Sequence, residues 1–176
     1  GAYIFRPKSD SPQPYSNINK MYYADGVTTA IVVLDGSRTL TRAYFSKTTD
    51  YVRNFGFTIE SQLDSIPIDD GVGKEVTLNL KTGLNGNRTF YTDSMGLEEQ
   101  KRVIDYRPSW NYTVFEPVAG NFYPVNAFLR LQDSASADRM VTVISDRSQG
   151  GTVLRQGEIE LMIHRRLLVD DSRGVG

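Results

Sequence analysis

The residues that could do chemistry in this sequence begin with a single histidine, His164, and the chain contains no cysteine. Without cysteine there is no thiol nucleophile and no thiolate metal site. A Ser-His-Asp triad would have to use His164, and a zinc site of the usual kind would need more than one imidazole. We therefore expect no catalytic residue, no metal site and no cofactor within this chain.

Paired acids are the next candidates, and they occur at Asp69-Asp70, Glu98-Glu99 and Asp170-Asp171. A retaining glycosidase needs two carboxyl groups about 5–5.5 Å apart on either side of the sugar. Neighbouring residues on a strand point to opposite faces, so one dipeptide rarely supplies both groups. We interpret these pairs as solvated loop charge.

Two short motifs resemble catalytic loops but lack an essential part. Asp70-Gly71-Val72-Gly73-Lys74 has neither the glycine spacing of a phosphate loop nor the Ser or Thr after the lysine, because Glu75 follows. Asp146-Arg147-Ser148 lacks the glycines of a nucleophile elbow. Both are typical of polar turns.

A dense charged segment runs from His164 to Arg173. Its arginines are suited to bidentate salt bridges that could fix the chain against a neighbouring domain, and the alternative is a solvated strand end. His164 alternates away from the apolar residues of 159–163, which favours a polar or interface role over a metal-ligand role.

Composition limits the class of protein. The 176 residues are enough for one domain with a real core, and 39% hydrophobic with 23% charged residues suits a folded protein. A net charge of −1 argues against nucleic-acid binding. No apolar run approaches the ~20 residues of a membrane helix, so we expect no membrane contact. Two sequons, at Asn87 and Asn111, are glycosylation candidates that fit the secretory route.

The elements that must position these residues are strands, because apolar residues recur with period two. The pattern predicts strands over 75–81, 125–131 and 159–163, and a hairpin of 28–34 and 39–45 around Asp35-Gly36. Residues 55–59 alternate in the same way. The best helix candidate is 95–103, while 6–16 and 108–121 are irregular. Many short strands at close spacing predict an all-β fold, an antiparallel β-sandwich.

Three long stretches carry a family resemblance. They are Phe90–Ser94 with Arg102 and Asp105–Pro108; Glu116–Asn126; and Asp146–Gly151 with Glu160–Leu168 and Asp170–Val175. Together with the opening Gly1–Pro7, they resemble the central β region of family 38 α-mannosidases. The residues of these motifs are most similar to those of the lysosomal, acid-acting branch. Between Lys8 and Val72 little matches beyond the strand pattern.

The resemblance implies a retaining mannosidase whose nucleophile and zinc ligands lie in an N-terminal α/β domain, and whose β region is mutarotase-like. It implies zinc in the full-length enzyme, mannose-containing glycans as substrate, and the α/β catalytic domain and remaining β domains as partners. In relatives a Tyr of the motif Asn-Tyr-Tyr-Pro approaches the sugar. Here the motif reads Asn121-Phe122-Tyr123-Pro124, so Tyr123 is the matching substrate-binding candidate.

We accordingly expect residues 1–176 to be a single, non-catalytic β-sandwich region of a larger α-mannosidase active in glycoprotein glycan turnover, with the region truncated at its C-terminus. The expected location is a lysosome or an equivalent acidic vacuole, or secretion. The alternative is a stand-alone glycan-binding sandwich without hydrolase activity. An upstream α/β domain with zinc ligands would discriminate between the two.

Overall fold

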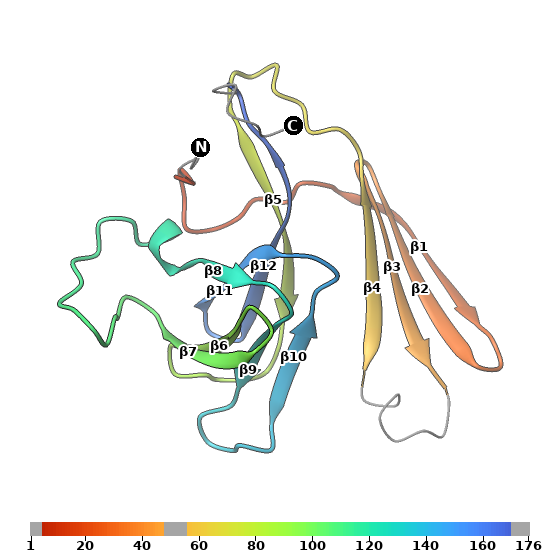
Figure 1. The fold of residues 1–176 in the computed structure, drawn as a ribbon. Coiled ribbons are helices and arrows are strands. Elements are labelled where there is room, and N and C mark those ends of the chain that lie inside the picture. Colours follow the sequence, from red (N-terminus) through yellow and green to blue (C-terminus); the bar gives the residue numbers. More distant parts are fainter. Residues whose placement is uncertain (1–4, 48–55, 170–176) are drawn as a thin grey trace. The chain divides into compact units, whose positions relative to one another are not determined.

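The computed structural model describes residues 5–47 and 56–169, so the opening Gly1–Ile4, the residue Phe55 and the acids Asp170-Asp171 lie outside the described part. Every strand pair among the described residues is antiparallel. The prediction of an all-β, antiparallel sandwich fold is confirmed (Figure 1). Contacts divide the chain into two compact units, a smaller unit of Gln13–Pro67 and a larger unit of Gly1–Pro12 with Ile68–Gly176. The prediction that 1–176 is one domain stays a prediction.

The smaller unit is one four-stranded meander. Its strands follow chain order: β1 (Ile18–Asp25), β2 (Thr29–Gly36), β3 (Thr39–Ser46) and β4 (Phe57–Leu63). The hairpin predicted around Asp35-Gly36 is confirmed as β2–β3, with Ala30 opposite Phe45 and Leu34 opposite Thr41. Period-two side chains and the short connections from β1 to β2 and from β2 to β3 favour this simple meander.

The larger unit contains two four-stranded sheets. One has the order β10 (Met140–Ile144), β9 (Phe128–Gln132), β6 (Thr89–Ser94), β7 (Glu98–Val103). The other has the order β5 (Lys74–Lys81), β12 (Glu158–Arg166), β11 (Gln149–Arg155), β8 (Tyr123–Val125). A short 3-10 helix, η1, spans Ala119–Asn121. Among the described residues no helix is long and apolar enough to cross a bilayer.

The core of the larger unit draws on both of its sheets. The hydrophobic residues with no exposed surface come from β6, β8, β9 and β12, and the buried cluster comprises Leu84, Phe90, Ile104, Val125, Leu129, Leu131, Val153, Ile159 and Leu161. Because each strand contributes alternate residues, the cluster follows directly from the period-two pattern. This packing fixes β8 against β11 and thereby places the Asn121–Asn126 motif.

Two predicted elements were wrong. The helix candidate 95–103 is a turn followed by β7, because Met95 and Gly96 adopt positive φ and Glu98–Val103 pair with β6. The strand predicted over 125–131 is broken into β8 and β9 at Asn126-Ala127. The break has a local cause. The Asp93 carboxylate accepts hydrogen bonds from the backbone N–H groups of Asn126, Ala127 and Phe128, which then cannot pair with a strand.

Candidate functional site

Tyr123 stands at the start of β8, where the strand alternation turns its ring toward the core. Its ring meets Phe90 edge-on, with the ring centroids 5.8 Å apart. The side chain is half-buried, and burial raises the pKa of the phenol above its usual value while two nearby arginines oppose that rise. Within residues 5–47 and 56–169 no side chain or backbone group forms a hydrogen bond with the Tyr123 hydroxyl.

Two arginines flank the Tyr123 ring. The guanidinium carbon of Arg102 lies 4.5 Å from the ring centroid, and that of Arg107 lies 5.0 Å from it. Arg102 is oriented by a hydrogen bond from its Nε to Thr92 Oγ1 (3.0 Å), and Arg107 donates to the carbonyls of Tyr106 and Gly120. Cation–π contacts of this kind fix the plane of the ring. Tyr123 is therefore a pre-oriented side chain.

Asn121 fixes the loop that leads into β8. It is fully buried; its amide Nδ2 donates to Asp105 Oδ1 (2.7 Å) and to the Pro117 carbonyl (2.8 Å), while its Oδ1 accepts from the Asp105 N–H (2.9 Å). The Thr152 hydroxyl on β11 donates to the Asn121 carbonyl (2.7 Å). Buried amides are tolerated when satisfied in this way, so the irregular stretch 108–121 has a defined path.

An open depression of about 350 Å³ lies on the sheet that contains β8, β11 and β12. It is lined by Glu75, Pro124, Asn126, Arg147, Ser148, Gln149, Gly150, Met162, Ile163, His164 and Arg165. We call it the sheet depression. It unites residues of the second and third of the motif stretches, which are far apart in the chain, since β11 pairs with β8 on one side and with β12 on the other.

The charges of the sheet depression are arranged in pairs. Arg165 Nε donates to Glu75 Oε2 at 2.9 Å across the β5–β12 ladder, and burial raises the pKa of Glu75 although Arg165 opposes the rise. Arg147 pairs with Asp146 at 2.7 Å on the exposed rim, and this pairing lowers the pKa of Asp146. His164 is exposed. Such a surface can hydrogen-bond polar groups of a neighbouring domain or a sugar.

The structure does not bring Tyr123 into the sheet depression. Pro124 and Asn126 line it, whereas Tyr123 and Val125 point the other way because successive strand residues alternate. The motif Asp146-Arg147-Ser148 is predicted from the sequence as a polar turn, and no local pattern in the sequence marks Glu75 as a functional residue. The cross-strand partnership of Glu75 with Arg165 could only be found from the β5–β12 register.

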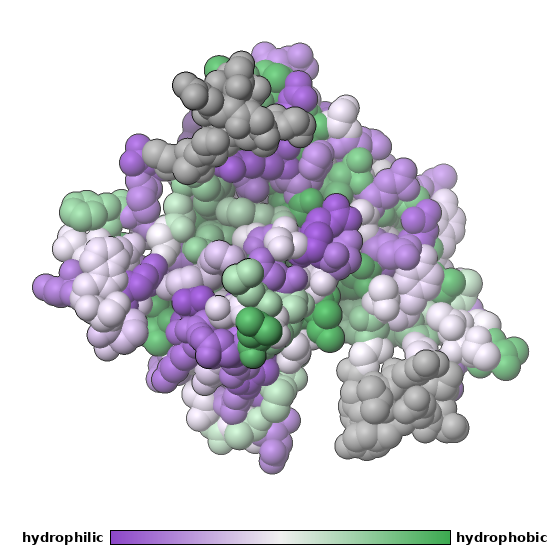
Figure 2. Space-filling model, viewed as in Figure 1, coloured by the Kyte–Doolittle hydropathy of each residue, from purple (hydrophilic) through white to green (hydrophobic). Residues whose placement is uncertain are grey.

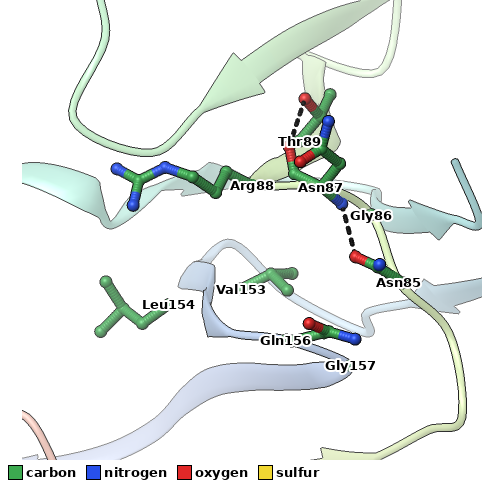
Figure 3. Close-up of a pocket in the computed structure, with 9 residues that line it drawn as sticks. All are labelled: Asn85, Gly86, Asn87, Arg88, Thr89, Val153, Leu154, Gln156 and Gly157. Atoms are coloured by element: carbon green, nitrogen blue, oxygen red, sulfur yellow. Dashed lines mark hydrogen bonds between the residues drawn. The ribbon is translucent and has the colours of Figure 1, made fainter.

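The glycosylation candidates Asn87 and Asn111 both occupy exposed positions. Asn87 lies in a turn with positive φ and borders a smaller pocket of about 170 Å³, formed by residues 85–89 and the β11–β12 turn (Figure 3). The Asn87 N–H donates to Asn85 Oδ1 at 3.0 Å. Backbone turns dominate this pocket, and its lining contains no acid or histidine.

The remaining acidic candidates make separate contacts at the surface, and Glu99 is paired with Arg130. Asp70 accepts from Lys74 Nζ at 2.7 Å within its own turn, and Glu98 and Glu99 begin β7 as exposed residues. In the part of the chain that is described, no three acids or histidines gather in a way that could hold a metal ion. Of the segment His164–Arg173, the residues up to 169 are described.

Comparisons with known proteins identify the chain's relatives. A model of the glycosyl hydrolases family 38 C-terminal domain matches residues 1–173. The lysosomal alpha-mannosidase of Dictyostelium discoideum is 39% identical over 100% of this chain, and that of Homo sapiens is 41% identical over 99%. A probable alpha-mannosidase of Arabidopsis thaliana is 40% identical over 99%.

The chain is short beside these relatives, since it spans 17%, 17% and 16% of their lengths respectively. The match nevertheless includes the strands of both units. It covers Lys8–Val72, where the sequence motifs showed little resemblance to the family. The family match agrees with the all-β fold and with the position of the motifs around β8, β11 and β12. The chain belongs to glycosyl hydrolase family 38, and it matches the C-terminal domain of that family over residues 1–173.

Proposed function

We propose that this chain is a non-catalytic β region of a retaining α-mannosidase that acts in glycoprotein glycan turnover. The observation that carries the proposal is the match over 1–173, in which relatives named as α-mannosidases are about 40% identical yet far longer. With one histidine and no cysteine, the chain has few groups for nucleophilic or zinc chemistry. The catalytic aspartate and the zinc would therefore belong to an α/β domain elsewhere in the polypeptide.

The role proposed for this region is to support the catalytic domain and to complete the substrate pocket. The sheet depression supplies paired charges at an exposed surface, which suits a polar contact between domains. Tyr123 supplies a pre-oriented phenol whose hydroxyl has no hydrogen-bond partner in the described part of the chain. A tyrosine of this kind can hydrogen-bond a mannose hydroxyl and offer its apolar ring to the sugar.

The proposed location is the lysosome, or the equivalent acidic vacuole, because the relatives from Dictyostelium discoideum, Bos taurus and Homo sapiens are named lysosomal. Two exposed sequons are compatible with passage through the secretory route. Immunofluorescence of the full-length protein beside a lysosomal marker tests this. Retention in the cytosol would contradict it.

The experiment that tests the function compares two purified proteins, the full-length polypeptide and residues 1–176. Both are assayed with a chromogenic α-mannoside and zinc at acidic pH. We expect turnover by the full-length protein and none by residues 1–176. An inactive full-length protein that still binds mannosyl glycans would favour a glycan-binding module, and turnover by residues 1–176 would overturn the non-catalytic role.

A further inference from the structure

Four side chains of the larger unit lie in a row that starts at Tyr123. The guanidinium carbon of Arg107 lies 5.0 Å from the centroid of the Tyr123 ring and 4.6 Å from that of the Tyr112 ring. The Tyr112 ring centroid lies 5.8 Å from that of Trp110. We call Tyr123, Arg107, Tyr112 and Trp110 the aromatic row. It connects the half-buried Tyr123 to Trp110, which is 62% exposed.

The outer half of the aromatic row lies on the irregular loop between β7 and η1, which extends from the larger unit in Figure 1. Arg107 is fixed beside this loop, because it donates to the carbonyls of Tyr106 and Gly120. Gly120 also makes room for Tyr112, since a Cβ at position 120 would clash with the Tyr112 hydroxyl oxygen. Tyr112 is therefore held between Arg107 and η1, and Trp110 packs against it.

Polar groups line the aromatic row. In residues 5–47 and 56–169, nothing forms a hydrogen bond with the Trp110 N–H or with the hydroxyls of Tyr112 and Tyr123. Neither Arg102 nor Arg107, the two arginines at Tyr123, forms an ion pair with a carboxylate in that part of the chain. The row therefore presents aromatic faces together with hydrogen-bond donors.

This combination selects a sugar over an apolar protein surface. A sugar ring has apolar C–H faces and a rim of hydroxyls, so its site needs aromatic surface and a few polar groups side by side. Figure 2 shows hydrophilic, near-neutral and hydrophobic atoms intermixed at this edge of the larger unit. A protein contact would favour one contiguous apolar patch instead.

We propose that the aromatic row binds the glycan substrate beyond its terminal mannose, with Trp110 and Tyr112 supporting a sugar residue further along an oligomannoside. This rests on the proposed function, in which Tyr123 contacts the terminal mannose. Continuity argues for it, because each member of the row lies against the next from Tyr123 to the exposed Trp110. A chain of linked sugars that starts at Tyr123 can follow the row outward.

The test compares two substrates of the full-length polypeptide by the mannose that each releases. Methyl α-mannoside has one sugar and an aglycone too small to reach Trp110, whereas linear α-mannotriose extends beyond it. For Trp110→Ala we expect the ratio of the KM for mannotriose to the KM for methyl α-mannoside to rise roughly three- to tenfold. The kcat for mannotriose should change much less, because a contact made equally in the ground and transition states acts on KM. Trp110→Phe keeps a ring and should restore most of the ratio.

Phe115→Ala is the matched control, since Phe115 lies on the same loop, is 83% exposed and stands outside the aromatic row. It should leave the ratio unchanged. Intact mass confirms that all variants carry the same modification at the adjacent sequon residue Asn111. An unchanged ratio in Trp110→Ala, or an equal rise in Phe115→Ala, would overturn the inference. An unchanged ratio with a melting temperature lowered only in Trp110→Ala would overturn it in favour of a protein contact at Trp110.

The two proposals fail separately. A mannosidase whose ratio is the same in wild type and Trp110→Ala would overturn this inference and leave the function standing. A full-length protein that releases no mannose from either substrate would overturn the hydrolase function. Calorimetric titration with mannotriose would then still test the aromatic row, because Trp110→Ala should weaken binding and Phe115→Ala should not.

Discussion

Tyr123 is held by its ring and not by its hydroxyl. Phe90 packs against one edge, and the guanidinium groups of Arg102 and Arg107 lie within 5.0 Å of the ring centroid. All of these contacts are available to a phenylalanine as well. A Tyr123→Phe substitution therefore separates the contribution of the hydroxyl from that of the ring.

In the full-length enzyme we expect Tyr123→Phe to lower kcat/KM by the equivalent of roughly 0.5–1.5 kcal/mol, the usual net value of one neutral hydrogen bond. The thermal transition should stay close to that of the wild type, because the packing of the ring is retained. Steady-state kinetics with an α-mannoside and a melting curve measure the two effects. Unchanged kinetics in a stable variant would remove Tyr123 from the substrate site.

Asp93 is a structural carboxylate with four backbone donors. It is 2% exposed, and it accepts from the N–H groups of Asn126, Ala127 and Phe128 on Oδ1 and of Gly96 on Oδ2. Burial raises its pKa, but the four donors outweigh burial and lower the pKa to about 2. The folded protein thus keeps Asp93 ionised at mildly acidic pH.

We expect Asp93→Asn to cost roughly 1–3 kcal/mol of stability, because an amide cannot accept on both sides as the carboxylate does. The folded pKa lies below the ordinary value of 3.8, so this contribution is complete above pH 3.8 and is lost as pH falls toward 2. Urea titrations of residues 1–176 at several pH values measure it. The exposed Asp138→Asn is the control; equal, pH-independent losses in both variants would contradict this role.

Asn87 and Asn111 are exposed sequon residues, and we expect both to carry N-glycans after expression in a eukaryotic secretory system. Exposure of the acceptor amide is the physical requirement that each meets. Intact-mass analysis before and after glycosidase treatment measures occupancy, and Asn87→Gln and Asn111→Gln should each remove one glycan. An unmodified mass in the secreted protein would contradict the prediction.

At the scale of elements, the ladder of β5 with β12 contains two glutamates in poorly hydrated positions. Glu160 is 6% exposed and Glu75 faces Arg165. Burial raises the pKa of both carboxyls; for Glu160 the Thr77 hydroxyl and Arg155, whose Nη2 is 3.9 Å from the carboxylate, oppose the rise. Protonation of these two carboxyls would therefore favour the folded state, because it removes the cost of the buried charge.

For Glu160→Gln we expect a stability gain relative to the wild type that grows as pH rises. The folded pKa lies above the ordinary value of 4.5, so the folded wild type binds the proton more tightly and loses stability as pH rises above 4.5. The glutamine variant has no such loss. Thermal melts at pH 4 and pH 7 measure the difference, with the exposed Glu98→Gln as control. If the difference in stability between the variant and the wild type became smaller toward neutral pH, the favourable charge of Arg155 would outweigh the cost of burying the Glu160 carboxylate.

At the scale of the whole molecule, we expect zinc content to distinguish residues 1–176 from the full-length polypeptide. We expect residues 1–176 to hold no stoichiometric zinc after dialysis, because one imidazole and scattered carboxylates make a poor closed site. The full-length polypeptide should retain zinc under the same conditions. Elemental analysis of both proteins measures this, and one tightly held zinc in residues 1–176 would show that the metal site lies here.

The sequence by itself determined the fold class and most strands, because apolar and polar residues alternate along a strand that is buried on one face. The β2–β3 hairpin and β5 were predictable for this reason. The family motifs likewise marked Tyr123, although its role stays a prediction.

Only the tertiary structure decided where β8 ends and what surrounds the motifs. The break at Asn126 depends on Asp93, 33 residues earlier in the chain, and local pattern carries no information on such a bond. The β12 register decided that Glu75 meets Arg165. Strand alternation turned Tyr123 to the core and Pro124 to the sheet depression. Each of these three features depends on which strands pair. Strand pairing joins residues that are far apart in the chain, and burial of the whole core determines it.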